Sequence, residues 1–270
     1  AAGQKQNKME DYPFYSIDGD EVHEVAVGPV HAGIIEPGHF RFNCLGEMGA
    51  HLEIQLGYQH RGIERAVVEG PSRRVIHYME TAAGDTTIGH AHAYCRAFES
   101  LSKTRVPARA QVLRGIAAEL ERIANHVGDL GALAGDVAFL PTMSYCGRLR
   151  GDALNMTAAL CGNRFGRGLV RPGGVAFDLD ERAVAGLLAR LDALERGVRV
   201  AVELLWETAS VTARFDGTGV VPPDVCRQIG LVGVAARACG LEQDVRNDFP
   251  YGIYRFAAIP VSTVPTGDVF

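Results

Sequence analysis

The segment ARAQVLRGIAAELERIANHVGDLGALAG, residues 108–135, decides the fold. Its apolar residues recur every three or four positions, which is the spacing of an amphipathic helix with one buried face. The segment therefore predicts one long helix. The residues that form its apolar stripe are Val112, Ile116, Leu120, Ile123, Val127 and Leu130.

Three further stretches with helical patterns flank this segment. They run from Pro71 to about Pro107, from about Pro141 to Phe165, and from the LDERA sequence at 179–183 to a break at Asp216–Gly217. Long helices joined by short Pro/Gly connections indicate a bundle. Residues up to Leu56 alternate instead like short strands. The sequence thus predicts a mainly α (α+β) fold, with a central bundle of long helices and a small N-terminal β-containing region.

The same patterns divide the chain into four parts. We expect a mobile N-terminus at 1–12, an α+β entry region at 13–66, a helical bundle core at 67–216 and an irregular C-terminal segment at 217–270. Prolines in the last part prevent long elements. The sequence stops at TGDVF without a closing helix, and we interpret it as a truncated part of something longer.

Composition excludes several classes of protein. Apolar residues make up 47% and charged residues 22%, which is ordinary for a globular protein. The net charge of −5 argues against nucleic-acid binding. No apolar run is long enough to cross a bilayer, so we expect a cytoplasmic protein that could dock on a membrane complex. The six cysteines form no CxxC pair and are expected to be reduced thiols.

Seven of the nine histidines lie between His31 and His92. Histidine titrates near neutral pH, so this concentration indicates a polar site or a proton route. Within it, Glu36 and His39 flank a Pro-Gly turn, and a carboxylate beside an imidazole suits proton transfer. The alternative is a pair that merely stabilises a surface turn.

Three other motifs carry polar groups in suggestive positions. In ELERIANHVGD, Glu119 lies one turn from Arg122 and Arg122 one turn from His126, although a solvated helix face would look the same. His60 and Arg61 follow an apparent strand, where side chains often face a partner. The small residues of ETAAGDTTIGHAHAY leave one helix surface nearly bare, for tight packing or for a cavity.

Taken in order, these segments resemble the large subunit of nickel–iron hydrogenases. The likeness is greatest to the membrane-bound, energy-converting branch, which includes formate hydrogenlyase, and to the quinone-proximal large subunit of respiratory complex I. It extends from Asp11 to Phe270. The matching landmarks are GPVHAGIIEPGHFRF, LGYQHRGIE, AYCRAFESL, ELERIANHVGDLGAL, CGRLRGDAL and VRPGGV.

The chain departs from the hydrogenases at the metal ligands. Where that family has Arg-x-Cys-Gly-x-Cys followed after three residues by His, this sequence has Thr81, Ala83 and Thr86 in place of the Arg and both Cys, while His90 remains. Nickel and low-spin iron require soft thiolate ligands, which Ala and Thr cannot supply. The resemblance therefore implies no metal bound by this chain at Ala83 and Thr86.

The resemblance also implies roles for five residues. Glu36 matches a proton-transfer glutamate, His39 overlies a quinone-contacting histidine of the complex I relatives, and His90 is the histidine kept beside the lost ligands. Arg61 and His126 match residues that face a 4Fe–4S cluster held by the neighbouring small subunit. The quinone-contacting Tyr of complex I falls on a glycine here.

Four hypotheses follow. The first is an electron-transfer subunit of an NADH-quinone-oxidoreductase-like or hydrogenase-like complex, peripheral on the cytoplasmic side of the membrane and inactive alone. Its partners would be an iron–sulfur small subunit and, indirectly, a membrane arm, and its metal-free pocket would receive a quinone. The second is a non-catalytic scaffold. A true hydrogenase is disfavoured by the missing thiolates, and a separate soluble metal site by the lack of HxxxH or HExxH spacing.

Overall fold

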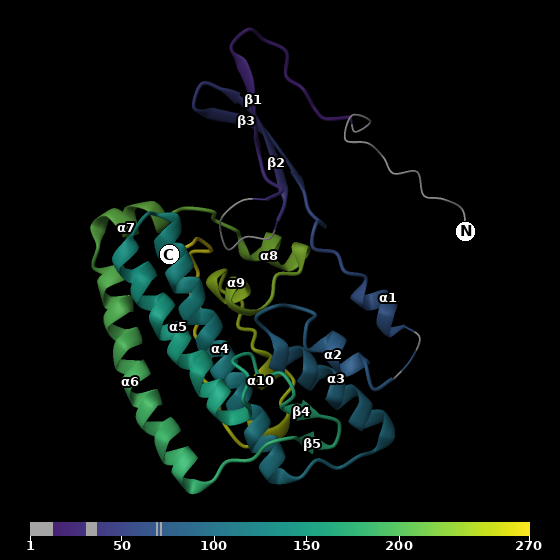
Figure 1. Cartoon of the computed structure of the whole chain (residues 1–270). Coiled ribbons are helices and arrows are strands. Elements are labelled where there is room, and N and C mark those ends of the chain that lie inside the picture. The colour runs from purple at the N-terminus through teal and green to yellow at the C-terminus, as the bar shows by residue number, and fades with distance from the viewer. Residues whose placement is uncertain (1–12, 31–36, 69, 71) are drawn as a thin grey trace. The chain divides into compact units, whose positions relative to one another are not determined.

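A computed structural model describes residues 13–30, 37–68, 70 and 72–270 of the chain, drawn in Figure 1. The chain divides into two compact units, residues 1–68 and residues 69–270. The expected N-terminal segment 1–12 lies outside the described residues, and the finer division into four parts stays a prediction.

The first unit contains a three-stranded antiparallel sheet in the order β1-β2-β3. Its strands are β1 (Val22–Val27), β2 (His39–Leu45) and β3 (Met48–Gln55), followed by the short helix α1 (Ile63–Val67). Leu45 pairs with Met48 across a two-residue turn, and Gly46 in that turn has φ +58°. A positive φ suits glycine because it lacks a Cβ, which is why the strands reverse here.

The second unit is built around four long helices. They are α3 (Thr87–Ser102), α4 (Ala108–Asp136), α5 (Leu140–Cys161) and α6 (Glu181–Trp206), shown in Figure 1. Helix α4 packs mainly on α5, and α5 packs on α6. A Cβ added at Gly131 of α4 would lie 2.9 Å from the Cβ of Cys146 in α5, so the glycine permits this close approach. The mainly α (α+β) fold class is confirmed.

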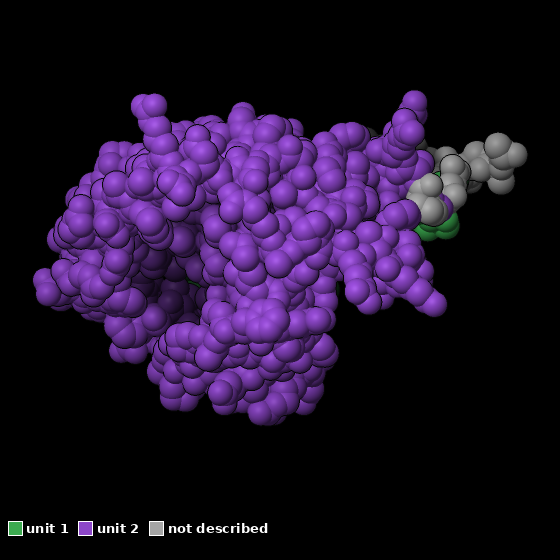
Figure 2. All heavy atoms as spheres, turned by 90° about the horizontal axis from the view of Figure 1, so that it is seen from below, with its two compact units in different colours: residues 1–68 green, residues 69–270 purple. Residues whose placement is uncertain are grey.

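Short elements complete the second unit. In the space-filling view from below, its surface is deeply hollowed (Figure 2). Among the described residues, no helix is both long enough and apolar enough to cross a membrane. The short elements are α2 (Val75–Met79), β4 (Val170–Arg171), β5 (Gly174–Val175), α7 (Ala209–Phe215), α8 (Pro223–Ile229), α9 (Gly233–Ala238), α10 (Val245–Asp248) and the 3₁₀ helix η2 (Gly252–Arg255).

Two helix predictions are wrong in detail. The stretch after Pro71 forms α2 and α3 with a non-helical segment at 80–86 between them. The Thr87 hydroxyl donates to the Glu80 carbonyl at 2.9 Å and holds this turn. The last long helix ends at Trp206, and α7 begins after Thr208, whose hydroxyl donates to the carbonyl of Leu204 at 2.7 Å. Side-chain bonds to nearby carbonyls compete with the helical pattern.

A buried ion pair joins the helices to the small β4–β5 hairpin. Glu99 of α3 and Arg114 of α4 lie 2.7 Å apart, with side chains only 7% and 2% exposed. Arg114 also donates to the carbonyls of Arg171 and Gly174, and the Glu99 carboxylate accepts from the Gly173 amide at 2.7 Å. Each charge thus has several partners, as burial demands.

We expect Arg114→Ala to lower the free energy of unfolding by about 3 to 5 kcal/mol, because it leaves the Glu99 carboxylate buried without its cation. The matched control is Arg199→Ala in α6, where the pair with Glu195 is exposed. That control should cost roughly 0.5 kcal/mol. Urea unfolding monitored by circular dichroism measures both, and equal losses would contradict this account of the buried pair.

Candidate functional site

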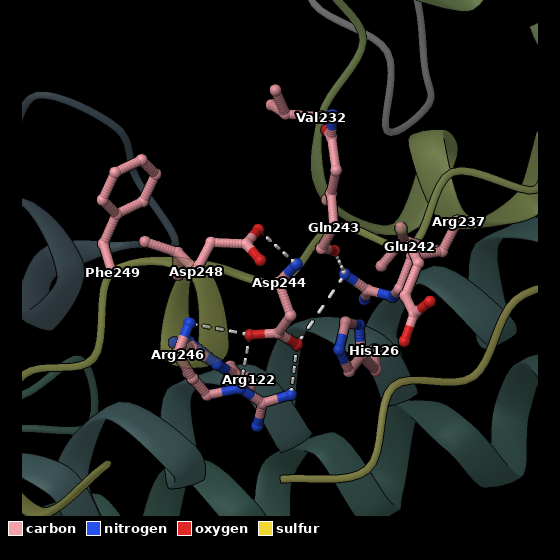
Figure 3. Close-up of a pocket in the computed structure, with 13 residues that line it drawn as sticks. Arg122, His126, Val232, Arg237, Glu242, Gln243, Asp244, Arg246, Asp248 and Phe249 are labelled. Carbon is pink, nitrogen blue, oxygen red and sulfur yellow. Dashed lines mark hydrogen bonds and ion pairs between the residues drawn. The ribbon is translucent and has the colours of Figure 1, made fainter. Parts of the chain in front are cut away.

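Helix α4 and the C-terminal segment together enclose a cavity of about 870 Å³ in the second unit. Arg122 and His126, one helical turn apart on α4, form one wall (Figure 3). The opposite wall comes from α9, α10 and the residues around them. These lining residues are Val232, Gly233, Val234, Arg237, Glu242, Gln243, Asp244, Val245, Arg246, Asp248 and Phe249.

Ion pairs fix the side chain of Arg246, which lies on the side of this cavity formed by the C-terminal segment. Arg246 binds Asp244 through two contacts, Nε to Oδ1 at 2.9 Å and Nη2 to Oδ2 at 2.7 Å. Its third nitrogen, Nη1, donates to Glu119 of α4 at 3.0 Å. The hydrogen bonds from Arg246 lower the pKa of Asp244 to about 2, so the pair stays ionised at neutral pH.

Glu119 ties α4 to two parts of the C-terminal segment. Besides Arg246, its carboxylate accepts a hydrogen bond from the hydroxyl of Tyr254 in η2. Burial and this bond raise the pKa of the Tyr254 hydroxyl, which therefore remains a donor. Glu119 also lies 3.6 Å from Arg122, so the i,i+3 pairing expected from the sequence is confirmed.

His126 lies among three arginines and several carboxylates. Partial burial lowers the pKa of its imidazole, and the charges of Arg237, Arg122 and Arg246 act in the same direction, while Asp129 opposes them. The ring is therefore neutral near pH 7 and can donate one hydrogen bond and accept another. This wall of the cavity therefore carries both a charged arginine, Arg122, and a ring, that of His126, which can form hydrogen bonds.

The segment that carries the replaced ligand positions, Thr81–Thr86, lies against the same helix. The Asn125 side chain donates to the carbonyl of Asp85 at 3.3 Å, and Arg150 of α5 lies 3.3 Å from the Asp85 carboxylate. Helical spacing alone would pair Asn125 with Asp129 instead. The polar face of α4 thus positions a segment about 40 residues earlier in the chain.

Glu121 of α4 holds the beginning of α3. Its two carboxylate oxygens accept hydrogen bonds from the amides of Ile88, at 2.7 Å, and Gly89, at 2.9 Å. Burial raises the pKa of Glu121 to about 7, although both amides and Arg122 lower it. A cavity beside Glu121 and Asp85 measures about 10 Å³, so the second unit leaves no room there for a quinone ring.

His39 is the best defined of the expected proton-transfer residues. It begins β2, its side chain is 5% exposed, and its ring meets the edge of Phe14 with centroids 6.1 Å apart. Within the part of the chain that the structure describes, neither ring nitrogen has a hydrogen-bond partner. A buried imidazole needs hydrogen-bond partners, and the described residues supply none to either nitrogen of His39.

The remaining expected site residues are distributed over the chain. Glu36 lies outside the described residues. Arg61 lies just before α1 in the first unit, and His90 is exposed on α3 and does not line the large cavity. Within the described part of the second unit, the structure brings Glu119, Arg122 and His126 together on α4, whereas His90 lies apart from the cavity that Arg122 and His126 border.

The sequence did not reveal the side of the cavity that the C-terminal segment forms. It also did not reveal that Glu121 binds the amides at the start of α3. Arg237, Asp244 and Arg246 lie more than 100 residues beyond His126, and no local spacing connects them. Glu121 belongs to a recognisable motif, but its partners are backbone amides of another helix. Such partners leave no trace in side-chain spacing.

The donor atoms do not fit a nickel–iron centre. The resemblance described above implies that Ala83 and Thr86 stand at ligand positions of such a centre, and neither side chain can supply a thiolate. Among residues 13–30, 37–68, 70 and 72–270, no three His, Cys, Asp or Glu side chains gather as metal ligands.

Comparison with known proteins places this architecture in a family. Residues 136–270 match the model of the respiratory-chain NADH dehydrogenase 49 kDa subunit. The carbon monoxide-induced hydrogenase of Rhodospirillum rubrum is 32% identical over 92% of this chain and 69% of its own length. Subunit 4 of the NADH-quinone oxidoreductase of Thermus thermophilus is 32% identical over 93% of this chain and 61% of its own. The chain belongs to the family of these 49 kDa subunits.

A solved structure supports the fold. A chain of the membrane-bound sulfane sulfur reductase, an archaeal respiratory membrane complex, superimposes with a TM-score of 0.86 at 22% identity, over 94% of this chain and 68% of its own. Several matched relatives are longer, since the membrane-bound hydrogenase subunit alpha of Pyrococcus furiosus is covered over 54% of its length. The expected resemblance to the hydrogenase and complex I large subunits is confirmed.

We expect Glu121 to make stability fall as pH rises. Because its pKa in the folded chain, about 7, exceeds the ordinary 4.5, the folded state keeps a proton that the unfolded state releases between these pH values. This contribution is complete below pH 4.5 and is lost by pH 7, to the extent of about 3 kcal/mol at most.

Glu121→Gln should remove this dependence, so that the difference in unfolding free energy between variant and parent changes steadily from pH 4.5 to 7. Burial lowers the pKa of His92 to about 4, which gives an opposite slope, but both proteins share it. Urea unfolding across this pH range measures the difference. A constant difference would show that Glu121 is ionised throughout.

Proposed function

We propose that the chain is an electron-transfer subunit of a membrane-associated complex of the NADH-quinone oxidoreductase or hydrogenase type. Its relatives are named as subunits of such complexes, and the 49 kDa family supplies the class. The observation that supports the proposal most is the grouping of Arg122, Arg237 and Arg246 around His126 in one cavity. These residues would face a 4Fe–4S cluster carried by a small subunit.

The side chains around His126 are chemically suited to lie beside a 4Fe–4S cluster. A 4Fe–4S cluster held by four cysteine thiolates is anionic, and its potential responds to nearby charge and to hydrogen bonds at sulfur. Arginines provide charge that persists at any physiological pH, and the neutral His126 ring provides a donor. Arg61 of the first unit is the second residue that we assign to the surroundings of the cluster.

Proton handling is assigned to Glu36, His39 and His90. The buried His39 ring offers two nitrogens without partners among the described residues, which would suit the carbonyl or hydroxyl oxygens of a quinone headgroup. The 10 Å³ space beside Glu121 is too small for that ring. A quinone site would therefore need groups beyond those around Glu121, such as His39 or a surface of a partner subunit.

We place the subunit peripherally on the cytoplasmic side of its membrane. Relatives belong to membrane-bound respiratory or hydrogenase complexes, in which a membrane arm would contact this chain only indirectly. The scaffold alternative explains the loss of the cysteine pair equally well. It gives no reason for the burial of a His39 ring that no described residue satisfies, so we favour electron transfer.

The first test measures the partner's cluster in the complex purified from its source. His126→Ala should lower the midpoint potential of the 4Fe–4S cluster and reduce its change with pH, because the neutral ring would take up a proton when the cluster is reduced, and the resulting imidazolium would stabilise the extra electron. Redox titration followed by electron paramagnetic resonance gives both values. The matched control is His23→Ala, an exposed strand residue. Equal potentials in all three complexes would contradict the assigned role of His126.

The second test concerns the acceptor and the metal. Glu36→Gln and His39→Ala should each strongly reduce quinone-dependent oxidation by the purified complex, while the subunit composition remains intact. Unchanged rates would favour the scaffold. Elemental analysis should find nickel at background level, and a content near one nickel per chain would overturn the interpretation of Ala83 and Thr86.

A further inference from the structure

The three-stranded sheet of the first unit has two chemically unlike faces. Residues directly opposite each other on antiparallel strands project to the same side. Val25 lies opposite Phe42, and Phe42 opposite Leu52. The next such row is Val27, Phe40 and Ile54. One face of the sheet is therefore wholly apolar over two rows of three residues, which we call the apolar face.

The opposite, polar face is covered by the chain itself. Its rows contain Arg41 beside Glu53, and Asn43 beside His51. The segment before β1 lies on these residues. The Tyr15 amide donates to the Glu53 carboxylate, and the Asn43 side chain donates to the Tyr15 carbonyl, each at 3.3 Å. Asn43 is consequently fully buried.

The apolar face remains exposed, which reverses the usual arrangement. Val25, Val27, Leu52 and Ile54 are 40%, 42%, 42% and 55% exposed. A half-solvated antiparallel sheet normally turns its polar face to water and its apolar face to a core. A contiguous apolar patch left in water indicates a surface that another molecule covers.

Charge indicates which molecule this is. Residues 1–68 contain five Lys or Arg and ten Asp or Glu, a net charge of −5 that equals that of the whole chain. Four of the carboxylates, all exposed, gather where β1 begins and where β2 turns into β3. They are Asp18, Asp20, Glu21 and Glu47. An acidic margin repels a second copy of itself and an anionic lipid surface, and it attracts a basic protein.

We propose that the apolar face is a docking surface for a companion protein that presents an apolar patch edged by Lys or Arg. The basic edge would meet the four carboxylates at one end of the sheet, and the patch would bury Val25, Val27, Leu52 and Ile54. This surface belongs to the first unit alone. It requires neither electron transfer nor a cluster beside His126, so it stands apart from the proposed function.

Site-specific photo-crosslinking tests the surface in the complex purified from its source. A benzophenone amino acid replaces Leu52, and the control replaces Leu101, an isolated leucine of α3 that is 87% exposed. We expect irradiation at position 52, and not at 101, to join the chain to one companion subunit through a peptide that contains Lys or Arg. An adduct with residues 69–270 of the same chain, with a second copy or with lipid, or no adduct, would overturn the proposal.

Two variants then test the forces at the surface. Leu52→Thr with Ile54→Thr keeps β-forming residues in the strand, so the sheet should remain folded by circular dichroism. We expect it to weaken binding of the crosslinked subunit roughly tenfold or more, whereas Leu101→Thr leaves binding unchanged. The double variant Glu21→Lys with Glu47→Lys should also weaken binding of the crosslinked subunit, and this loss of affinity should be largest at low salt. Unchanged affinity in both double variants would also overturn the proposal.

Discussion

The buried pair of Glu99 and Arg114 is the constraint on which the second unit depends. It joins α3, α4 and the β4–β5 hairpin at one point, where Arg114 donates to the carbonyls of Arg171 and Gly174 and the Glu99 carboxylate accepts from the amide of Gly173. Because neither charge can be left unpaired in that environment, the three elements have one acceptable arrangement. The position of α4, and with it the direction of His126 and Glu121, follows from this arrangement.

Much of the fold was predictable because periodicity and turn chemistry are local. The stripe from Val112 to Leu130 indicated α4, and the alternation of residues up to Leu56 indicated the short strands of the first unit. The break between α2 and α3 and the end of α6 were missed. There, threonine hydroxyls bond to carbonyls four to seven residues back, and an apolar pattern does not record this competition.

The candidate site was predictable only on one side. Arg122 and His126 are one turn apart, so the sequence alone could pair them. The other wall comes from residues 232–249, and the long-range contacts of Glu119 with Arg246 and Tyr254 hold it there. The sequence placed Glu121 on the long helix. It could not show that the Glu121 carboxylate accepts hydrogen bonds from backbone amides, because the location of those amides depends on how α3 begins.

The division of the cavity between α4 and the C-terminal segment has a consequence for how such a subunit can be adapted. Glu119 anchors the segment, while Arg237 and Asp248 lie on the short helices α9 and α10 and Glu242 lies on the loop between them. Exchanging these residues would alter the electrostatic potential at His126 without repacking any long helix. Residues 232–249 can therefore vary in charge while the packing of the four long helices stays the same.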